Sequence, residues 1–312
     1  MGIKKYLALG ILILSMLTGC KSITGYSTLE TQTQQTQTLP SIEQMIGQPQ
    51  TAENEISIGT FNIQIFGKTK REKDDVMKKL VDIVDDYDII AVQEFRDKEM
   101  ETPLYFLEKI NSVEGNNYSI VVSERLGRTS AKEQYAFYYD NTKIEFLDRS
   151  FVFPDEEDVF EREPFIAYFK TKKGEFDFYL VNIHTKPDDA TDEIKNLAKV
   201  KTYIFQKHPG DGDIIFLGDF NADGSYYDED NNALGEQYFW AIQNNLDTTV
   251  AKSDNTYDRI VFLKEYTLED YAYKSGVDRF EKRWNDISEE EMKAISDHYP
   301  VWGIFYAKKI KP

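Results

Sequence analysis

The sequence predicts an α/β fold, a layered sandwich in which helices cover the outer faces of sheets. Short apolar segments with strand-like alternation recur along the chain, and amphipathic helical segments stand between them. These strand-like segments are too numerous for one ordinary open sheet. Apolar residues make up 41% and aromatic residues 14% of the 312 residues, which is ample for a packed core and excludes a wholly disordered chain.

Polar side chains stand at the ends of several expected strands. Residues 56–65 alternate at period two, and residues 89–92 are an apolar run that ends in Gln93 and Glu94. Other strands are expected at residues 135–139, 176–183, 214–217, 259–262 and 301–306. Because His, Asp or Asn adjoins several of these segments, we expect functional side chains at strand ends.

Two longer segments have the spacing of amphipathic helices, residues 70–84 and residues 192–206, and each is expected to pack one side on a sheet. Residues 103–110 and 236–244 are expected to form shorter helices. The intervening residues 153–163 are expected to form an acidic loop.

The first residues have the pattern of an export signal. Two lysines precede a short apolar stretch, residues 6–16, and Leu-Thr-Gly-Cys follows it, ending at Cys20. This pattern resembles the lipobox of bacterial lipoproteins, which implies cleavage before Cys20 and a lipid on its sulfur. We therefore expect residues 1–19 to be a signal peptide and the exported protein to be anchored to a membrane of the cell envelope. The alternative is an ordinary buried N-terminal strand or helix.

Residues 20–54 are expected to be a flexible tether, because they are rich in Thr, Gln, Ser and Pro and lack periodicity. The folded domain is then expected at residues 55–308. Cys20 is the only cysteine, so no internal disulfide can stabilise this domain. Stability must come from the core and from a bound metal.

The charge balance argues against a polyanionic substrate. There are 37 basic and 55 acidic residues, a net charge of -18, and such a field repels nucleic acid at long range. A bound divalent cation and local arginines would have to overcome this repulsion. Alternatively, most of the acidic residues only keep an exported protein soluble.

Two of the three histidines stand in polar clusters beside expected strands. His184 stands directly after the strand expected at residues 176–183, two residues from Asn182. His298 follows Asp297, just before the strand expected at residues 301–306. A lone histidine is more often a neutral core residue, but two such clusters favour catalysis. His208 follows a helical segment and is expected in a surface turn.

Carboxylates and carboxamides at other strand ends predict a metal site. Asp219 and Asn221 follow one expected strand, Glu94 follows another, and Asn62 stands in a third. Such oxygen ligands suit Mg²⁺ or Mn²⁺ better than zinc. Taken singly, each would be an ordinary turn residue, so the prediction depends on their occurring together.

Residues 219–224 also match the opening of a calcium-binding helix-loop-helix. The preceding segment is strand-like, however, and the twelfth position is Asp230, where that loop requires a bidentate Glu. These two departures weaken the calcium interpretation.

Together these clusters resemble the ordered motifs of the endonuclease/exonuclease/phosphatase superfamily and, within it, the deoxyribonuclease I type. The resemblance covers residues 55 to 306 and is carried by residues 91–97, 123–128, 132–135, 183–190, 218–226, 257–261 and 294–301. It implies a four-layer α/β/β/α sandwich of two mixed, mainly antiparallel sheets with outer helices. It also implies a metal-dependent endonuclease that hydrolyses DNA to 5′-phosphate and 3′-hydroxyl ends.

The resemblance further implies roles for individual residues. Glu94, helped by Asn62 and Asp297, would hold Mg²⁺ or Mn²⁺. His184 would pair with Glu133 and His298 with Asp258, since a carboxylate on one ring nitrogen fixes the tautomer and raises the basicity of the other. The members of this implied catalytic and metal-binding set are His184, His298, Glu133, Asp258, Asp219, Asn221, Glu94, Asn62 and Asp297.

His298 is our choice for the general base and His184 for the general acid, although spacing does not decide the order. Asp219 would orient the nucleophile, and Asn221 would bind a phosphate oxygen. The resemblance also implies that Arg96 and Arg128 reach phosphates or the minor groove, the alternative being solvated surface arginines.

The chain departs from the vertebrate pattern of this family. Ala131 stands where that pattern has a tyrosine that stacks in the minor groove, and Gly224 and Asn255 stand where it has a disulfide pair. Asp247 and Thr249 match part of a structural Ca²⁺ site whose other ligands would lie near residues 155–158; the alternative is an acidic turn.

Double-stranded DNA is the expected partner, the chain is expected to be a monomer, and RNA or single strands stay open. Two other functions remain alternatives. One is a phosphodiesterase of the same fold that acts on a lipid head group such as sphingomyelin, and the other is a non-catalytic calcium-binding surface lipoprotein.

Overall fold

The computed structural model describes residues 45–228, 232–284 and 286–308. The expected signal peptide at residues 1–19, Cys20 and most of the expected tether lie outside these described residues, as does Asp230. Within the described ranges, no helix combines the length and the apolar character that crossing a bilayer requires.

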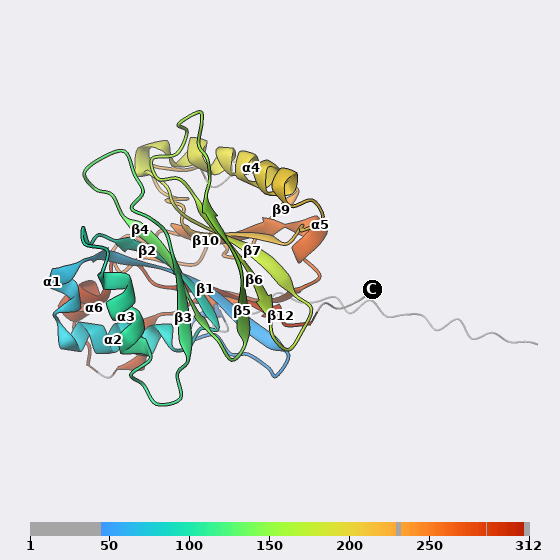
Figure 1. Cartoon of the computed structure of the whole chain (residues 1–312). Helices are drawn as coiled ribbons and strands as arrows, with labels where there is room; N and C mark the ends of the chain where they lie inside the picture. The colour runs from blue at the N-terminus through green and yellow to red at the C-terminus, as the bar shows by residue number, and fades with distance from the viewer. Residues whose placement is uncertain (1–44, 229–231, 285, 309–312) are drawn as a thin grey trace, which may run out of the picture. The chain divides into compact units, whose positions relative to one another are not determined.

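Two six-stranded sheets pack against each other (Figure 1). The first sheet has the order β11 (Tyr271–Val277), β12 (Val301–Tyr306), β1 (Glu55–Phe66), β2 (Ile89–Phe95), β4 (Gln134–Asp140) and β3 (Tyr118–Val122). The second has the order β5 (Ile144–Val152), β6 (Phe165–Thr171), β7 (Asp177–His184), β8 (Ile214–Asp219), β10 (Asp258–Leu263) and β9 (Tyr238–Trp240).

Helices cover the outer faces of both sheets (Figure 1). On the side of the first sheet lie α1 (Lys68–Arg71), α2 (Asp74–Val84), α3 (Thr102–Ile110) and α6 (Glu289–Ile295). On the side of the second sheet lie α4 (Ala190–Lys207) and α5 (Lys264–Thr267). The chain also forms 3₁₀ turns at Pro187–Asp189 and Phe280–Arg283. The predicted four-layer α/β/β/α sandwich is confirmed.

Each sheet contains one parallel pair, which brings two strand ends to the same edge. β1 and β2 are parallel and are connected through α1 and α2, while β7 and β8 are parallel and are connected through α4. In the second pair His184 is the register partner of Asp219. The other pairings among the described strands are antiparallel, so the sheets are mixed but mainly antiparallel.

The apolar core lies between the sheets and beneath α4. Phe137 of β4 lies 5.6 Å, between ring centroids, from both Phe165 and Phe169 of β6, which joins the inner faces of the two sheets. On the other face of the second sheet, Ile194 and Leu197 of α4 are fully buried. Each strand of the second sheet that lies beneath α4 is thus buried on both faces, which is why its sequence is continuously apolar.

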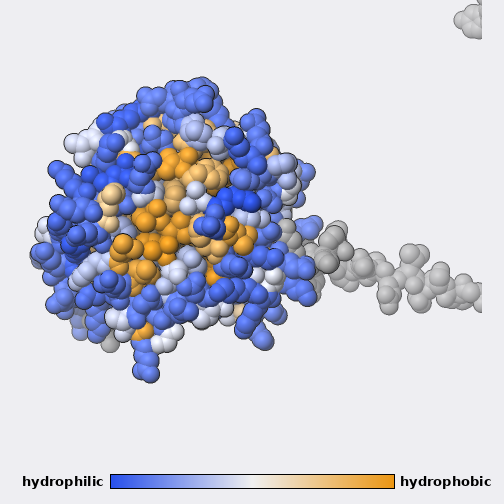
Figure 2. Space-filling view, in the orientation of Figure 1, coloured by the Kyte–Doolittle hydropathy of each residue, from blue (hydrophilic) through white to orange (hydrophobic). Residues whose placement is uncertain are grey.

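One edge of the sandwich exposes part of this core. Figure 2 shows apolar side chains gathered over the region of the edge strands β3 and β5, where half-buried Ile120 and Phe146 pack against the core. β5 also contains a register shift between Phe146 and Ser150, and Asp148 within it has φ 51°. A charged bulge of this kind twists an edge strand and opposes pairing with another chain.

The predicted strands are all present, whereas the helix predictions are only partly correct. The helix expected at residues 70–84 is broken into α1 and α2 around Glu72 and Lys73. The helix expected at residues 236–244 is wrong, because the aromatic run Tyr238–Trp240 forms β9 and pairs with β10. Besides β9, four further strands were not predicted (β3, β5, β6 and β11), and neither was α6, which begins with a capping box at Ser288.

The folded domain extends further towards the N-terminus than predicted. Met45 is 3% exposed and belongs to the core, and Ile46 forms a bridge with Val277. Trp302 Nε1 donates a hydrogen bond to Gly47 O at 2.7 Å. The expectation that residues 20–54 are all tether is therefore wrong for the packed residues after Met45; apolar Met45 and Ile46 stand out there against polar neighbours.

Met45→Ala should lower the free energy of unfolding by about 2–4 kcal/mol, because it removes buried methylene groups and leaves a cavity. Gln48→Ala, at an exposed position of the same segment, should change it by less than about 0.5 kcal/mol. Chemical denaturation of both variants measures the difference. Equal stabilities would show that this segment does not contribute to the core.

Candidate active site

The polar ends of both sheets converge on one cluster of histidines and carboxylates. Asn62 and Glu94 come from β1 and β2, His184 and Asp219 end β7 and β8, and Asp258 begins β10. His298 lies in the segment between α6 and β12, which Ser296 fastens to β1 through a hydrogen bond from its hydroxyl to Asn62 O at 2.6 Å.

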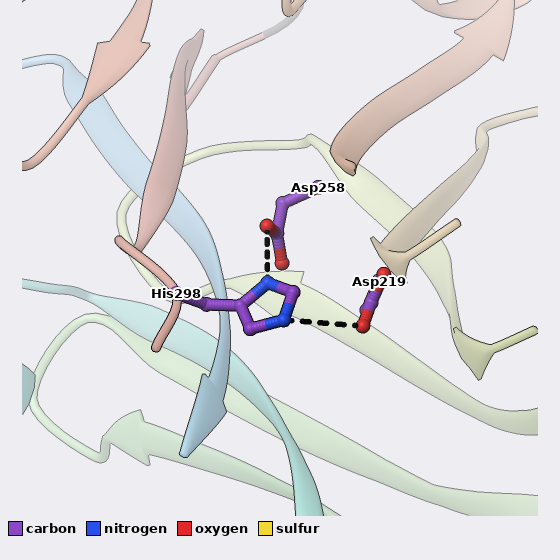
Figure 3. A group of neighbouring side chains, drawn as sticks. All are labelled: Asp219, Asp258 and His298. Atoms are coloured by element: carbon purple, nitrogen blue, oxygen red, sulfur yellow. Dashed lines mark hydrogen bonds and ion pairs between the residues drawn. The ribbon is translucent and has the colours of Figure 1, made fainter. Parts of the chain in front are cut away.

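His298 stands between two buried carboxylates (Figure 3). Its Nδ1 lies 2.8 Å from Asp258 Oδ2, and its Nε2 lies 3.6 Å from Asp219 Oδ2. Burial alone would lower the pKa of His298, but the negative charges of Asp258 and Asp219 outweigh it and raise the pKa well above its ordinary value. His298 therefore favours its protonated form in this arrangement.

His184 has the same kind of environment. Its Nδ1 lies 2.9 Å from Glu133 Oε1, and its Nε2 lies 3.4 Å from Asp219 Oδ2. Burial opposes protonation, yet the charge of Glu133 raises the pKa of His184. Burial would conversely raise the pKa of Glu133, but His184 and nearby arginines lower it. Both predicted histidine–carboxylate pairings are thus present in the structure.

Asp219 joins the two histidine pairs. It is 2% exposed, and the same oxygen that faces both Nε2 atoms accepts a hydrogen bond from Asn62 Nδ2 at 3.0 Å. Burial would raise the pKa of Asp219, but the charges of His298 and His184 lower it. The Asp219 carboxylate is therefore ionised and touches both sheets.

Glu94, an expected metal ligand, and Asp219 offer carboxylate oxygens of the kind that a hard divalent cation prefers. Asn62 Nδ2 lies 3.2 Å from Glu94 Oε1 and 3.0 Å from Asp219 Oδ2, so two carboxylates converge on one amide nitrogen. A cation between these two carboxylates would have oxygen ligands from both, and Asn62 could contribute only its Oδ1, since Nδ2 is a donor. Asp297, half exposed, lies with an oxygen 4.0 Å from His298 Nε2.

Asp219, Asp258 and His298 also offer ligand atoms within 4.8 Å of one another. Each ring nitrogen of His298 already faces a carboxylate, however, so a metal in this group would have to displace one of those contacts. The geometry of this group fits a proton-handling chain better than a metal centre.

Two residues expected to contact substrate lie within the cluster. Asn221 has φ 46°, and its Nδ2 donates to Thr185 O at 3.0 Å. Arg96 Nε lies 3.2 Å from Glu94 Oε2, and its Nη2 lies 3.5 Å from Glu133 Oε2. Arg96 therefore bridges the expected metal ligand and the partner of His184.

The structure holds Arg128 elsewhere. Its Nε lies 2.7 Å from Asp158 Oδ1, so the guanidinium that was expected to reach phosphates is bound to the acidic loop. Both side chains of this pair are exposed, so the ion pair is weak, and the predicted contact of Arg128 with phosphates stays a prediction. Ala131 is exposed and lies, like Arg128, in the segment between β3 and β4.

The expected calcium ligands Asp247 and Thr249 close their own turn. Asp247 Oδ1 accepts hydrogen bonds from Thr249 N and Oγ1 and from Asn255 N, and Asp247 Oδ2 lies 3.5 Å from Arg279 Nη1. The acidic turn is thus the interpretation that these contacts favour. Within the described ranges, Asp247 does not belong to a group of acidic and histidine ligands with metal-like spacing.

The helix-loop-helix interpretation of residues 219–224 is contradicted by the strand β8 that precedes them. A Cβ atom at Gly224 would lie 3.1 Å from Asn255 Oδ1. These two positions are therefore neighbours, in agreement with the disulfide positions that the resemblance assigned to them.

Arg162 is a site residue that the sequence analysis missed. It is 7% exposed, it donates to His184 O at 2.9 Å and to Thr185 O at 3.0 Å, and its Nε lies 3.7 Å from Glu133 Oε1. It lies in the segment expected to be an acidic loop, where Glu161 and Glu163 flank it. Because its neighbours are acidic, the sequence suggested a solvated surface, whereas the Arg162 guanidinium is buried beside His184.

Comparison with known proteins agrees with this geometry. Residues 59–298 match the model of the Endonuclease/Exonuclease/phosphatase family. The chain is 36% identical to human deoxyribonuclease gamma over 258 residues, which cover 78% of this chain and 84% of the relative. It is 35% identical to mouse deoxyribonuclease-1-like 2, with 79% and 90% covered, and 34% identical to bovine deoxyribonuclease-1, again with 79% and 90% covered.

Solved structures show the same fold at lower identity. A family protein from Bacteroides thetaiotaomicron superposes with a TM-score of 0.55 at 15% identity, covering 80% of this chain and 94% of that one. The human Nocturnin catalytic domain gives 0.56 at 13% identity, with 81% and 93% covered.

This chain therefore belongs to the endonuclease/exonuclease/phosphatase family. Membership of this family suggests that the chain uses a divalent metal. Its deoxyribonuclease relatives support a nuclease within that family.

Asp258→Asn should move the titration of His298 to lower pH, because the variant removes one of the two charges that raise its pKa. The three histidines can be followed by NMR of the ring protons. In the wild type, the stabilising effect of protonated His298 is complete below about pH 6.5 and is lost as the pH rises through its raised folded-state pKa. In the Asp258→Asn variant, the stabilisation by protonated His298 should disappear at a lower pH than in the wild type.

Asp254→Asn, at an exposed position nearby, is the matched control and should leave the His298 titration where it is. A His298 titration that Asp258→Asn does not move would contradict the pairing.

Proposed function

We propose that the protein is a metal-dependent endonuclease that hydrolyses DNA phosphodiester bonds to 5′-phosphate and 3′-hydroxyl ends. The observation that carries this proposal is the symmetry of the two histidines. Each has a carboxylate at Nδ1, Glu133 for His184 and Asp258 for His298, and each faces Asp219 through Nε2. The deoxyribonucleases to which the chain is similar support DNA as the substrate.

Two histidines presented in this way can handle the two proton transfers of phosphodiester hydrolysis. Their Nδ1 partners fix the tautomers, so that both Nε2 atoms face the reaction. His298 would take the proton of the attacking water, and His184 would give a proton to the leaving 3′-oxygen. Asp219 lies between them and would orient the water.

The remaining side chains would bind and neutralise the phosphate. A divalent cation held by Glu94, Asn62 and Asp297 would supply positive charge at the phosphate oxygens. Arg96, whose side chain is 26% exposed beside Glu94, can add a second positive charge, and Asn221 can donate to a phosphate oxygen. Such donors act mainly on the charge that develops in the transition state.

The raised pKa values of both histidines set a condition on this mechanism. Both favour the protonated state in the described structure, whereas the base must be neutral. A divalent cation held at Glu94 would offset part of the carboxylate charge that raises these pKa values. The assigned base, His298, must lose its proton before water attacks, whereas the assigned acid, His184, must keep its proton for the leaving oxygen.

His184→Ala and His298→Ala should each slow the cleavage of supercoiled plasmid at least ~100-fold in Mg²⁺, because each removes a proton-transfer group. A chelator should abolish wild-type cleavage. His208→Ala is the matched control, since His208 stacks on Tyr179 outside this cluster, and it should keep nearly the wild-type rate.

Equal cleavage by the wild type and both site variants would contradict the proposal. An intact plasmid together with phosphocholine release from sphingomyelin would favour the lipid-directed alternative.

A substrate with a p-nitrophenolate leaving group should separate the two roles, because that anion leaves without receiving a proton. On bis(p-nitrophenyl) phosphate, His184→Ala should regain most of the activity that it loses on DNA, whereas His298→Ala should stay impaired. The ratio of the two rates for each variant is the measurement. The opposite pattern would exchange the acid and base assignments.

A further inference from the structure

Lys70 is a buried lysine directly behind the proposed metal ligands. It belongs to the short helix α1, which follows β1, and it is 9% exposed. Its Nζ donates hydrogen bonds to Ile63 O at 2.5 Å and to Gln64 O at 2.9 Å. An ammonium group is costly to bury, so its contacts must compensate for the lost water.

These two carbonyls belong to an irregular segment of β1. The register between β1 and β2 shifts between Asn62 and Phe66. Within this interval Gln64 has φ 51° and Ile65 has φ 46°, a left-handed conformation that residues with side chains adopt rarely. Such a conformation persists where surrounding contacts determine it.

The same two peptide groups bind the proposed metal ligands through their N–H groups. The peptide between Ile63 and Gln64 donates from Gln64 N to Asn62 Oδ1 at 2.9 Å. The next peptide donates from Ile65 N to Glu94 Oε2 at 2.8 Å. Each peptide group thus has its carbonyl on Lys70 Nζ and its N–H on a ligand side chain. A positive charge on the carbonyl strengthens the N–H as a donor.

The charge of Lys70 also faces the site. Burial lowers the pKa of Lys70 to about 7, while the charges of Asp297 and Glu94 oppose this effect. Lys70 therefore lies within the electrostatic range of two proposed metal ligands. Its contacts, however, are with backbone carbonyls rather than with those carboxylates.

We propose that Lys70 is a positioning residue of the metal site. Lys70 holds the peptide groups Ile63–Gln64 and Gln64–Ile65 so that their N–H groups orient Asn62 and Glu94. This proposal rests on the proposed function for the assignment of Asn62 and Glu94 as metal ligands. Lys70 itself does not touch the metal or the substrate; it acts through the backbone of β1.

The test is the affinity of the protein for Mn²⁺ alone, measured by calorimetry or electron paramagnetic resonance. Lys70→Met keeps the apolar stem and removes the donor, and it should weaken Mn²⁺ binding about 10-fold or more, as loss of outer contacts to metal ligands does. Lys68→Met is the matched control: Lys68 lies in the same helix but is exposed and pairs with Glu99, and its variant should bind Mn²⁺ like the wild type.

The sign of the change separates positioning from simple repulsion. If Lys70 acted only as a positive charge near the cation, its removal would tighten Mn²⁺ binding, and that result would overturn the proposal, as would unchanged binding. Because no DNA is present, this outcome is independent of whether the protein cuts DNA.

Turnover and hydrogen exchange supply readouts that general destabilisation would not reproduce. At saturating Mn²⁺, Lys70→Met should lower kcat more than it changes KM for DNA. If the variant does not fold, hydrogen exchange of the wild type tests the proposal instead. The amides of Gln64 and Ile65 should be protected from exchange, and Mn²⁺ should increase this protection. Exchange at the rate of a free loop would contradict the proposed contacts.

Discussion

The charge of one buried carboxylate, Asp219, is the constraint on which the arrangement of this molecule depends. An ionised carboxylate that is 2% exposed is stable only if nearby groups compensate its charge, since burying it alone costs several kcal/mol. Here the compensation comes from both sheets: Asn62 from the first, His184 from the second, and His298 from the segment before β12. The charges of Glu133 and Asp258, with a further contribution from Asp219, raise the pKa values of His184 and His298 respectively. The charge balance of the cluster and the proposed acid–base roles therefore depend on the same groups.

The fold brings these groups together through its two parallel strand pairs. Because β7 and β8 run in the same direction and in register, His184 and Asp219 end side by side. β1 and β2 bring Asn62 and Glu94 to the corresponding end of the other sheet. The apolar core between the sheets fixes the distance between these two ends, so a cluster of polar residues far apart in the sequence becomes one site.

The sequence predicted the strands with polar ends, and the resemblance supplied the histidine–carboxylate pairs that the structure contains. What escaped prediction has a common physical cause. Arg162 and Lys70 stand in charged segments that suggest a solvated surface, yet backbone carbonyls make their burial favourable. Met45, which belongs to the core, likewise stands in a polar segment of the sequence. Periodicity reports which face is apolar; it does not report which charged side chain finds a buried partner.

We propose that His184 and His298 act as one unit around Asp219 in metal-dependent hydrolysis. The most direct test is kcat of the double variant His184→Ala/His298→Ala on DNA beside both single variants. Groups that act as a unit show strongly non-additive losses. The double variant should therefore be within about 10-fold of the slower single variant. Losses that multiply would contradict the claim, because they would show two histidines acting in separate steps or sites.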